Sequence, residues 1–111
     1  MQYLLLIYEN EKRFSQGYDE AEMGEYEAFG KEFSKNIQGG NALQLTKTAK
    51  SVRLRNGKAA VTDGPFAETK EQLGGFYLVE AANMDEAVKM AAKSPGARFG
   101  TIEVRPIMTF S

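Results

Sequence analysis

The sequence has 111 residues, with 14 lysines and arginines against 15 aspartates and glutamates, and it lacks histidine and cysteine. This length suits a single domain over residues 1–111, with a modest core that would gain from burial by a second copy. The balanced charge argues against nucleic-acid binding, and without histidine or cysteine we expect no disulfide, no zinc or haem and no other cofactor.

Residues 2–8 are almost continuously apolar, which predicts a central strand covered on both faces. This run lacks the basic start and the length of a signal peptide, and no other segment approaches membrane-spanning length. We therefore expect a cytoplasmic protein with no membrane contact. The polar residues 10–18 predict a connecting loop, with Phe14 as a candidate to pack back on the domain.

A helix is predicted from Asp19, which stands three residues before Glu22 as in a capping box, to the pair Gly39 and Gly40. Gly24 and Gly30 inside it cost about 1 kcal/mol each relative to alanine, and we interpret them as allowing a close approach to the sheet. The apolar positions recur every three or four residues: Met23, Tyr26, Phe29, Phe33 and Ile37.

Residues 42–46 alternate weakly and are a candidate strand. Residues 51–62 centre on Asn56 and Gly57, which predicts a hairpin with a type I′ turn. In this register Arg53 lies opposite Ala60.

Residues 76–81 predict a further core strand, followed by a helix that Asn83 begins as N-cap and that residues 94–96 stop. Residues 101–107 predict a last strand, which Pro106 assigns to a sheet edge. The apolar positions expected in the helix are Ala87, Val88, Ala91 and Ala92.

This order predicts an α+β fold: the ferredoxin-like split βαβ plan with an extra β-hairpin before the third core strand. Two helices cover only one face of such a sheet, so a second copy is the simple way to bury the other face. We therefore expect a homodimer. The alternative is a monomer whose long central loop folds back over the open face.

Residues 63–75 are the predicted site, a surface loop over a cleft. Asp63, Gly64 and Pro65 are turn residues, since Gly64 tolerates positive φ and Pro65 fixes its own φ. Asp63 either caps this turn or is a catalytic carboxylate at the cleft mouth. In the second case, desolvation against Phe66 and Tyr77 would raise its pKa and make it a general base.

The other charged candidates are less specific. Glu68 and Lys70 lie in the same loop, where alternating charges are usually solvated, and the carboxylate spacing matches no EF-hand, so we predict no metal. Arg53 and Arg105 lie on polar faces of strands and suit bidentate binding of a carboxylate or phosphate ligand. The alternative for both arginines is an ordinary ion pair with Glu103 or Asp63.

Three stretches, residues 63–71, 75–77 and 103–106, resemble the DGPF-type branch of the YCII-related proteins, and the resemblance spans nearly the full chain. It implies a dimeric α/β barrel of ferredoxin-like subunits with no settled activity, and several similar proteins are associated with extracytoplasmic-function sigma factors. The histidine and aspartate pair proposed as catalytic in the wider family cannot be carried over, because this chain has no histidine.

The favoured interpretation is a small-molecule-binding or regulatory homodimer associated with sigma-factor systems, which takes a small anionic metabolite. The alternative is an isomerase, lyase or hydrolase that uses Asp63 as acid and base, and a purely structural homodimer is the third possibility. The predicted ligand-binding residues are Arg53, Gly64, Pro65, Phe66, Glu68, Lys70, Tyr77 and Arg105.

Overall fold

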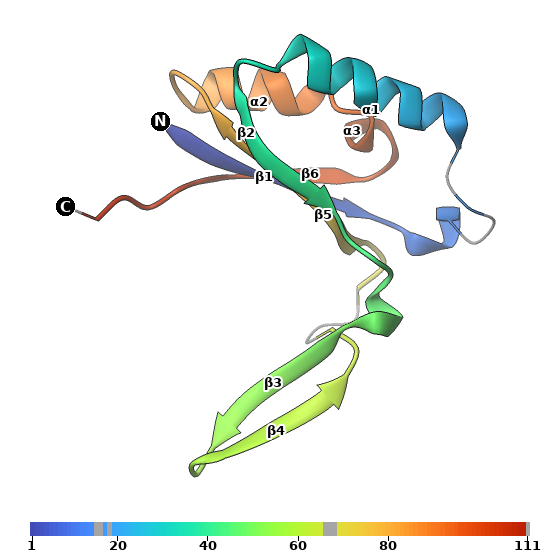
Figure 1. The fold of residues 1–111 in the computed structure, drawn as a ribbon, viewed down its shortest axis with the longest axis vertical. Helices are drawn as coiled ribbons and strands as arrows, with labels where there is room; N and C mark the ends of the chain where they lie inside the picture. Colours follow the sequence, from blue (N-terminus) through green and yellow to red (C-terminus); the bar gives the residue numbers. More distant parts are fainter. Residues whose placement is uncertain (15–16, 18, 66–68, 111) are drawn as a thin grey trace.

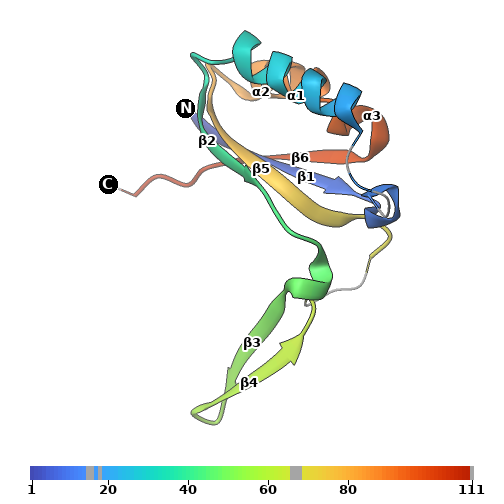
Figure 2. The ribbon, with the colours of Figure 1, turned by 45° about the vertical axis from the view of Figure 1, so that its right-hand side comes forward.

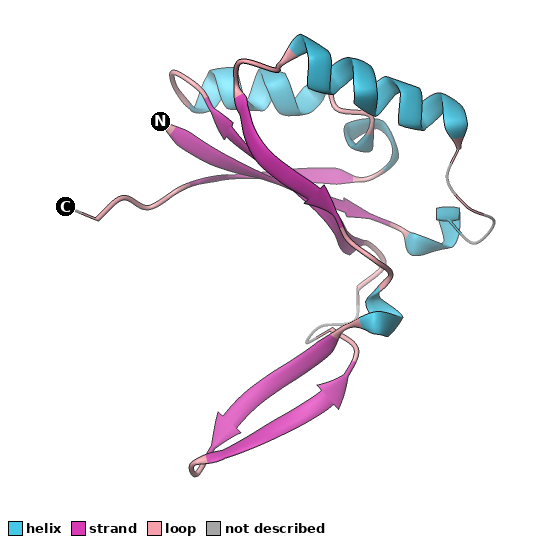
Figure 3. Ribbon diagram, in the orientation of Figure 1, coloured by secondary structure: helices cyan, strands magenta, loops and turns pink. Residues whose placement is uncertain are grey.

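The computed structural model describes residues 1–14, 17, 19–65 and 69–110 (Figures 1 and 3). In chain order the elements are β1 (Gln2–Glu9), η1 (Glu11–Phe14), α1 (Glu20–Glu32), β2 (Ile37–Ala42), η2 (Thr46–Thr48), β3 (Lys50–Arg55), β4 (Lys58–Asp63), β5 (Gln72–Glu80), α2 (Met84–Ala92), α3 (Gly96–Phe99) and β6 (Thr101–Pro106).

The main sheet is four-stranded and antiparallel, in the order β2-β5-β1-β6, and the helices lie together on one of its faces (Figures 1 and 2). β3 and β4 form a separate two-stranded sheet. The predicted α+β, ferredoxin-like fold with an inserted hairpin is therefore confirmed. β1 is central and β6 is an edge strand, as expected.

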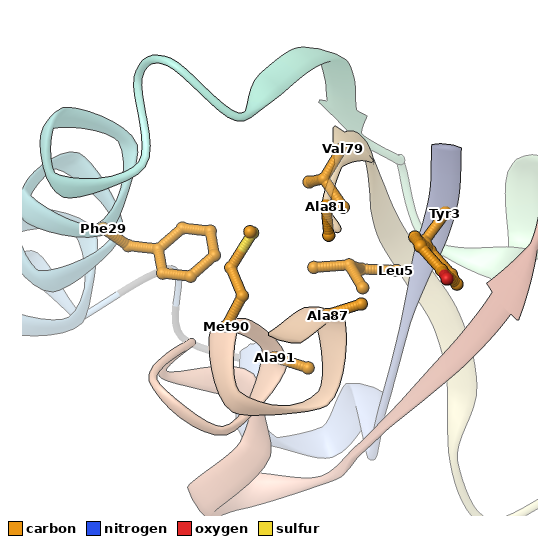
Figure 4. Packing of buried hydrophobic residues seen from close by; sticks show 8 residues of the cluster. All are labelled: Tyr3, Leu5, Phe29, Val79, Ala81, Ala87, Met90 and Ala91. Atoms are coloured by element: carbon orange, nitrogen blue, oxygen red, sulfur yellow. The ribbon is translucent and has the colours of Figure 1, made fainter. Parts of the chain in front are cut away.

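The core lies between the sheet and the helices, because alternate residues of β1 point inward. Leu5 is 1% exposed and Val79 is fully buried, and both meet Phe29 of α1 and Met90 of α2 in the cluster shown in Figure 4. Complete burial of a side chain such as Leu5 stabilises the fold by about 2 kcal/mol. Val88 was expected among the apolar positions of the helix but is half exposed, whereas Met90 is buried in the core.

The predicted start of α1 is confirmed, since the Asp19 carboxylate accepts a hydrogen bond from the amide of Ala21. The predicted end at Gly39 and Gly40 is wrong. The helix ends at Glu32, and Ile37 already opens β2, whose backbone pairs with β5. The candidate strand at residues 42–46 is therefore wrong: β2 spans Ile37–Ala42 and shares only Ala42 with it, and the short helix η2 begins at Thr46.

The interpretation of Gly24 and Gly30 is also wrong. A β-carbon placed on either glycine meets no atom within 4 Å, so neither position requires a close approach. The second helix begins as predicted, with the Asn83 side chain accepting from the amide of Glu86. No helix in the described part of the chain has the length and apolar character needed to cross a membrane.

The predicted hairpin is confirmed, with Arg53 opposite Ala60 and positive φ at Asn56 (52°) and Gly57 (77°). We call residues 50–63 the arm. It projects away from the main sheet on the side opposite to the helices (Figures 1 and 2). The radius of gyration of 15.8 Å reflects this projection, because a compact domain of this length would have about 13 Å.

The second face of the main sheet was predicted to be covered by a second copy, which one chain cannot test. The described helices cover one face only (Figure 2). The strand register places the remaining side chains of β1 together with those of β5 on the other face, where they are half buried. We call this surface the open face; its apolar members are Leu4, Leu6, Tyr8, Leu73, Phe76 and Leu78. The homodimer stays a prediction.

Candidate functional site

Asp63 lies at the end of β4, at the base of the arm. Its side chain is 83% exposed and pairs with the ammonium of Lys50. The desolvation that a general base requires is therefore not provided to Asp63 by the described part of the chain. Gly64 has the positive φ that was predicted to be tolerated there, 88°, and its amide donates to the carbonyl of Ala49 across the base of the arm.

The two predicted arginines lie on different sheets. Arg53 is exposed on the arm, whereas Arg105 is on β6 at the far edge of the main sheet. Arg105 lies 3.8 Å from the Glu103 carboxylate, which is the ion pair considered as the alternative to ligand binding. One protomer does not bring the two guanidinium groups together at a shared site.

The remaining predicted residues are also dispersed. Pro65 and Lys70 line two separate shallow hollows near Tyr8, and Phe66 and Glu68 lie outside the described residues. Tyr77 is on the opposite, helix-facing side of the sheet, where its ring packs 5.2 Å from that of Phe29. Tyr77 is therefore the predicted residue that lines a different and better enclosed site.

That site is a cavity of about 560 Å³ between α1 and the sheet, at the end of β1. Its volume is within the range of small-molecule sites, which is about 300–1,000 Å³. Apolar side chains dominate the described walls, with four carboxylates and two amides among them. The lining includes four acidic residues and two tyrosines: Glu9, Glu11, Asp19, Glu22, Tyr26 and Tyr77.

Strand and helix periodicity bring the acidic groups to this cavity. Glu9 continues the inward register of Tyr3, Leu5 and Ile7, so the alternation that buries the core also buries a carboxyl group. On α1, Glu22 and Tyr26 are four residues apart and therefore share one helix face. Glu9 and Glu22 are only 5% and 7% exposed.

Arg13 joins the two buried glutamates. Its Nη1 donates to Glu9 Oε2 at 3.2 Å and its Nη2 donates to Glu22 Oε2 at 2.7 Å. The guanidinium also stacks 3.9 Å from the centre of the Phe99 ring, which holds its orientation. The other oxygen of Glu9, Oε1, makes no hydrogen bond of normal geometry among the described residues.

Burial raises the pKa of Glu9 above its ordinary value of 4.5, because the charged form loses hydration. The charge of Arg13 and the nearby Tyr26 hydroxyl oppose this increase, whereas the charges of Glu22 and Glu71 add to it. Burial is also the main cause that raises the pKa of Tyr26 and of Tyr77. Both phenols therefore stay protonated near neutral pH and can donate hydrogen bonds.

Gly96, the first residue of α3, makes room for this cluster. A β-carbon at Gly96 would lie 2.8 Å from the Tyr26 hydroxyl, 2.9 Å from Cγ2 of Ile7 and 3.1 Å from Oε1 of Glu9. Phenol and carboxylate can thus lie close together only because this position has no side chain.

The site residues predicted from the sequence did not include Glu9, Glu22 or Arg13. One signal was present, since Glu9 is a charged residue on the inward register of an otherwise apolar strand. The residues that the structure describes contain no group of three or more acidic side chains arranged to hold a metal ion.

The fold is that of an α+β domain of the ferredoxin-like type, with a cavity between α1 and the sheet. The YCII-related domain model matches residues 1–111, so the chain belongs to the YCII-related family. An uncharacterized protein from Rhizobium meliloti (strain 1021) is 37% identical over 117 residues, covering 99% of this chain and 94% of the relative. Membership of the DGPF-type branch stays a prediction.

A solved structure with the same fold is that of a 5-chloro-2-hydroxyhydroquinone dehydrochlorinase from Burkholderia phenoliruptrix AC1100, in complex with 2,5-dihydroxybenzoquinone. The similarity has a TM-score of 0.56 and 16% sequence identity, and covers 97% of this chain and 94% of the other. At this identity the comparison supports the fold alone.

Proposed function

We propose that this protein is a small-molecule enzyme of the proton-transfer type, an isomerase or a lyase, whose active site is the cavity between α1 and the sheet. Glu9 acts in it as general acid and base. The observation that carries this proposal is that Glu9, a carboxylate only 5% exposed, lines a cavity of about 560 Å³.

Each group of the cluster has a chemical role. Arg13 binds Oε2 of Glu9 and so fixes the carboxylate plane, and the Glu9 carboxylate accepts a proton from the substrate. The raised pKa of Glu9, caused mainly by burial, brings the carboxyl group closer to neutral pH, where a general base is most effective. The Tyr26 phenol donates a hydrogen bond to negative charge that develops on the substrate.

Two outcomes are open to a substrate that has lost a proton to Glu9. The proton returns to a different atom in an isomerisation, or a leaving group departs with the electron pair in an elimination. Loss of HCl by a dehydrochlorinase, the activity named for the structural neighbour, belongs to the second class. A lyase is therefore one of the two classes that we propose, and the burial of Glu9 favours it over the exposed Asp63 as acid and base.

Exchange of carbon-bound hydrogen with heavy water tests the proposal. The protein is incubated with enolisable ketones, aminoketones and 2,5-dihydroxybenzoquinone, and deuterium incorporation is followed by NMR. Glu9→Gln should slow enzyme-dependent exchange by about 100-fold or more. Asp63→Asn is the matched control, because Asp63 is exposed and outside the cavity. Equal exchange rates for Glu9→Gln and the wild type would refute the role of Glu9.

We also propose that the working unit is a homodimer. The arm projects from the main sheet on the side opposite to the helices, which is the side of the open face (Figures 1 and 2). On the arm, Val52, Leu54 and Val61 are 65%, 66% and 59% exposed, and exposed apolar surface of this extent is typical of an interface. In a dimer with a two-fold axis, each arm would contact the partner subunit.

The association with sigma-factor systems stays a prediction that rests on the family resemblance. A regulatory dimer and an enzyme differ in one measurable respect, since a regulator binds its ligand without changing it. Deuterium incorporation, or conversion of any compound of the panel, decides between them.

A further inference from the structure

We infer that the cavity between α1 and the sheet selects an organic cation, a molecule with a protonated amine on an apolar or aromatic body. This inference rests on the proposed function, because it names the class of ligand for the same site. It differs from the anionic metabolite expected from Arg53 and Arg105, both of which lie outside the cavity.

The described wall of the cavity is acidic. Four carboxylates line it and no lysine or arginine does: Glu9, Glu11, Asp19 and Glu22. The nearest guanidinium is already engaged, since Arg13 binds both Glu9 and Glu22. With that pairing included, the acidic groups still outnumber the cation, and an anion that entered would face uncompensated repulsion.

The burial of Glu9 adds to the effect of this charge. Its side chain lines the cavity and is only 5% exposed. Water therefore screens its charge poorly, and a cation in the cavity is attracted more strongly than it would be by an exposed carboxylate. An ammonium group has three donors and no acceptor, which suits this environment.

The aromatic and aliphatic residues of the wall determine what the rest of the ligand can be. The rings of Phe14, Tyr26 and Tyr77 contribute to the wall, and aromatic faces attract cations. Aliphatic side chains, including Ile7, Leu43 and Leu45, line the remainder and favour an apolar body. A protonated amine also acidifies the C–H bonds beside it, which suits proton abstraction by Glu9.

The dipole of α1 would favour an anion in the cavity, but the carboxylates at the start of the helix offset it. The positive end of the α1 dipole lies at the cavity, because Asp19 and Glu22 belong to the start of this helix and line the wall. The Asp19 carboxylate caps the helix by accepting from the Ala21 amide, and Glu20 and Glu22 add negative charge to the first turn. The helix end therefore leaves no net attraction for an anionic ligand.

Three probes of the same size separate the charge states: benzylamine, benzyl alcohol and benzoate, which are cationic, neutral and anionic near neutral pH. Titration calorimetry gives each dissociation constant, and NMR shifts locate the binding. Benzylamine should bind about tenfold or more tightly than benzyl alcohol, and benzoate most weakly. Glu9→Gln should remove the advantage of benzylamine while leaving benzyl alcohol unaffected.

Glu27→Gln is the matched control, since Glu27 lies on α1 outside the cavity and its side chain is 71% exposed. It should leave all three affinities unchanged. Benzoate binding as tightly as benzylamine in the cavity would overturn the inference and leave the proposed enzyme intact. Absence of cavity binding by all three probes at about 10 mM would refute both. Selective benzylamine binding without any deuterium exchange would support the ligand class and refute the proton-transfer function.

Discussion

Replacing Gly96 with alanine tests the packing that places Tyr26 beside Glu9. The new β-carbon would lie 2.8 Å from the Tyr26 hydroxyl, 2.9 Å from Cγ2 of Ile7 and 3.1 Å from Glu9 Oε1. All three distances are shorter than ordinary van der Waals contact. Because Ile7 and Glu9 are buried on a central strand, neither can move away freely.

The magnitude follows from two opposing effects. Overpacking in a buried region costs about 1–3 kcal/mol, whereas alanine in place of glycine in a helix contributes up to about 1 kcal/mol of stability. We therefore expect Gly96→Ala to lower the free energy of unfolding by about 1–2 kcal/mol and the Tm by about 4–8 °C. Thermal and urea unfolding at one fixed protein concentration give both quantities.

Gly24→Ala is the matched control, because it adds the same methyl group inside α1 where no atom lies within 4 Å. It should raise the free energy of unfolding by about 1 kcal/mol. If Gly96→Ala proved as stable as the wild type, while Gly24→Ala behaved as expected, the close placement of Tyr26 and Glu9 would be wrong.

Three further predictions concern the turn, the buried acid and the open face. Gly57→Val should cost about 1–2 kcal/mol in an unfolding assay, since φ is 77° there and a β-branched residue resists positive φ; unchanged stability would argue against the turn. The pKa of Glu9 is raised by burial in the folded state, so its stabilising contribution is complete below about pH 4 and is lost as the pH rises through the folded-state pKa. Glu9→Gln should therefore gain stability relative to the wild type between about pH 4 and 7 in urea titrations, and a constant difference would contradict this. Leu6→Glu should convert the proposed dimer to the monomer mass in light scattering, because a charge buried at the interface costs several kcal/mol, whereas a persisting dimer would exclude the open face as the interface.

Local signals in the sequence were sufficient for most of the fold. The Asn56 and Gly57 turn and the caps at Asp19 and Asn83 formed as predicted because each depends on neighbours within four residues. The end of α1 did not follow local periodicity. Ile37 fits the apolar spacing of the helix, yet pairing with Val79 on β5 gives its backbone sheet partners and so starts β2.

The candidate site was missed for a different physical reason. The prediction of Asp63 as a site residue rested on turn chemistry and on the density of charged residues. Both are properties of exposed segments, and Asp63 is exposed. Desolvation depends on contacts between distant parts of the chain. Arg13, Glu22 and Gly96 come from separate segments, and their meeting around Glu9 cannot be read from spacing in the sequence.

The lack of histidine does not remove acid and base chemistry from this chain, because burial changes what a carboxyl group can do. Asp63 and Glu9 are both acidic residues at the ends of strands, but water solvates the first, while the second is 5% exposed and faces a neighbouring carboxylate. If Arg13 paired with Glu9 alone, it would stabilise the charged form and lower the pKa of that group. Because the same guanidinium also binds Glu22, two carboxylates share one cation, and burial keeps the pKa of Glu9 raised. In the proposed mechanism, a shared arginine thus holds the Glu9 carboxylate in a fixed orientation, while burial still keeps its pKa above the ordinary value.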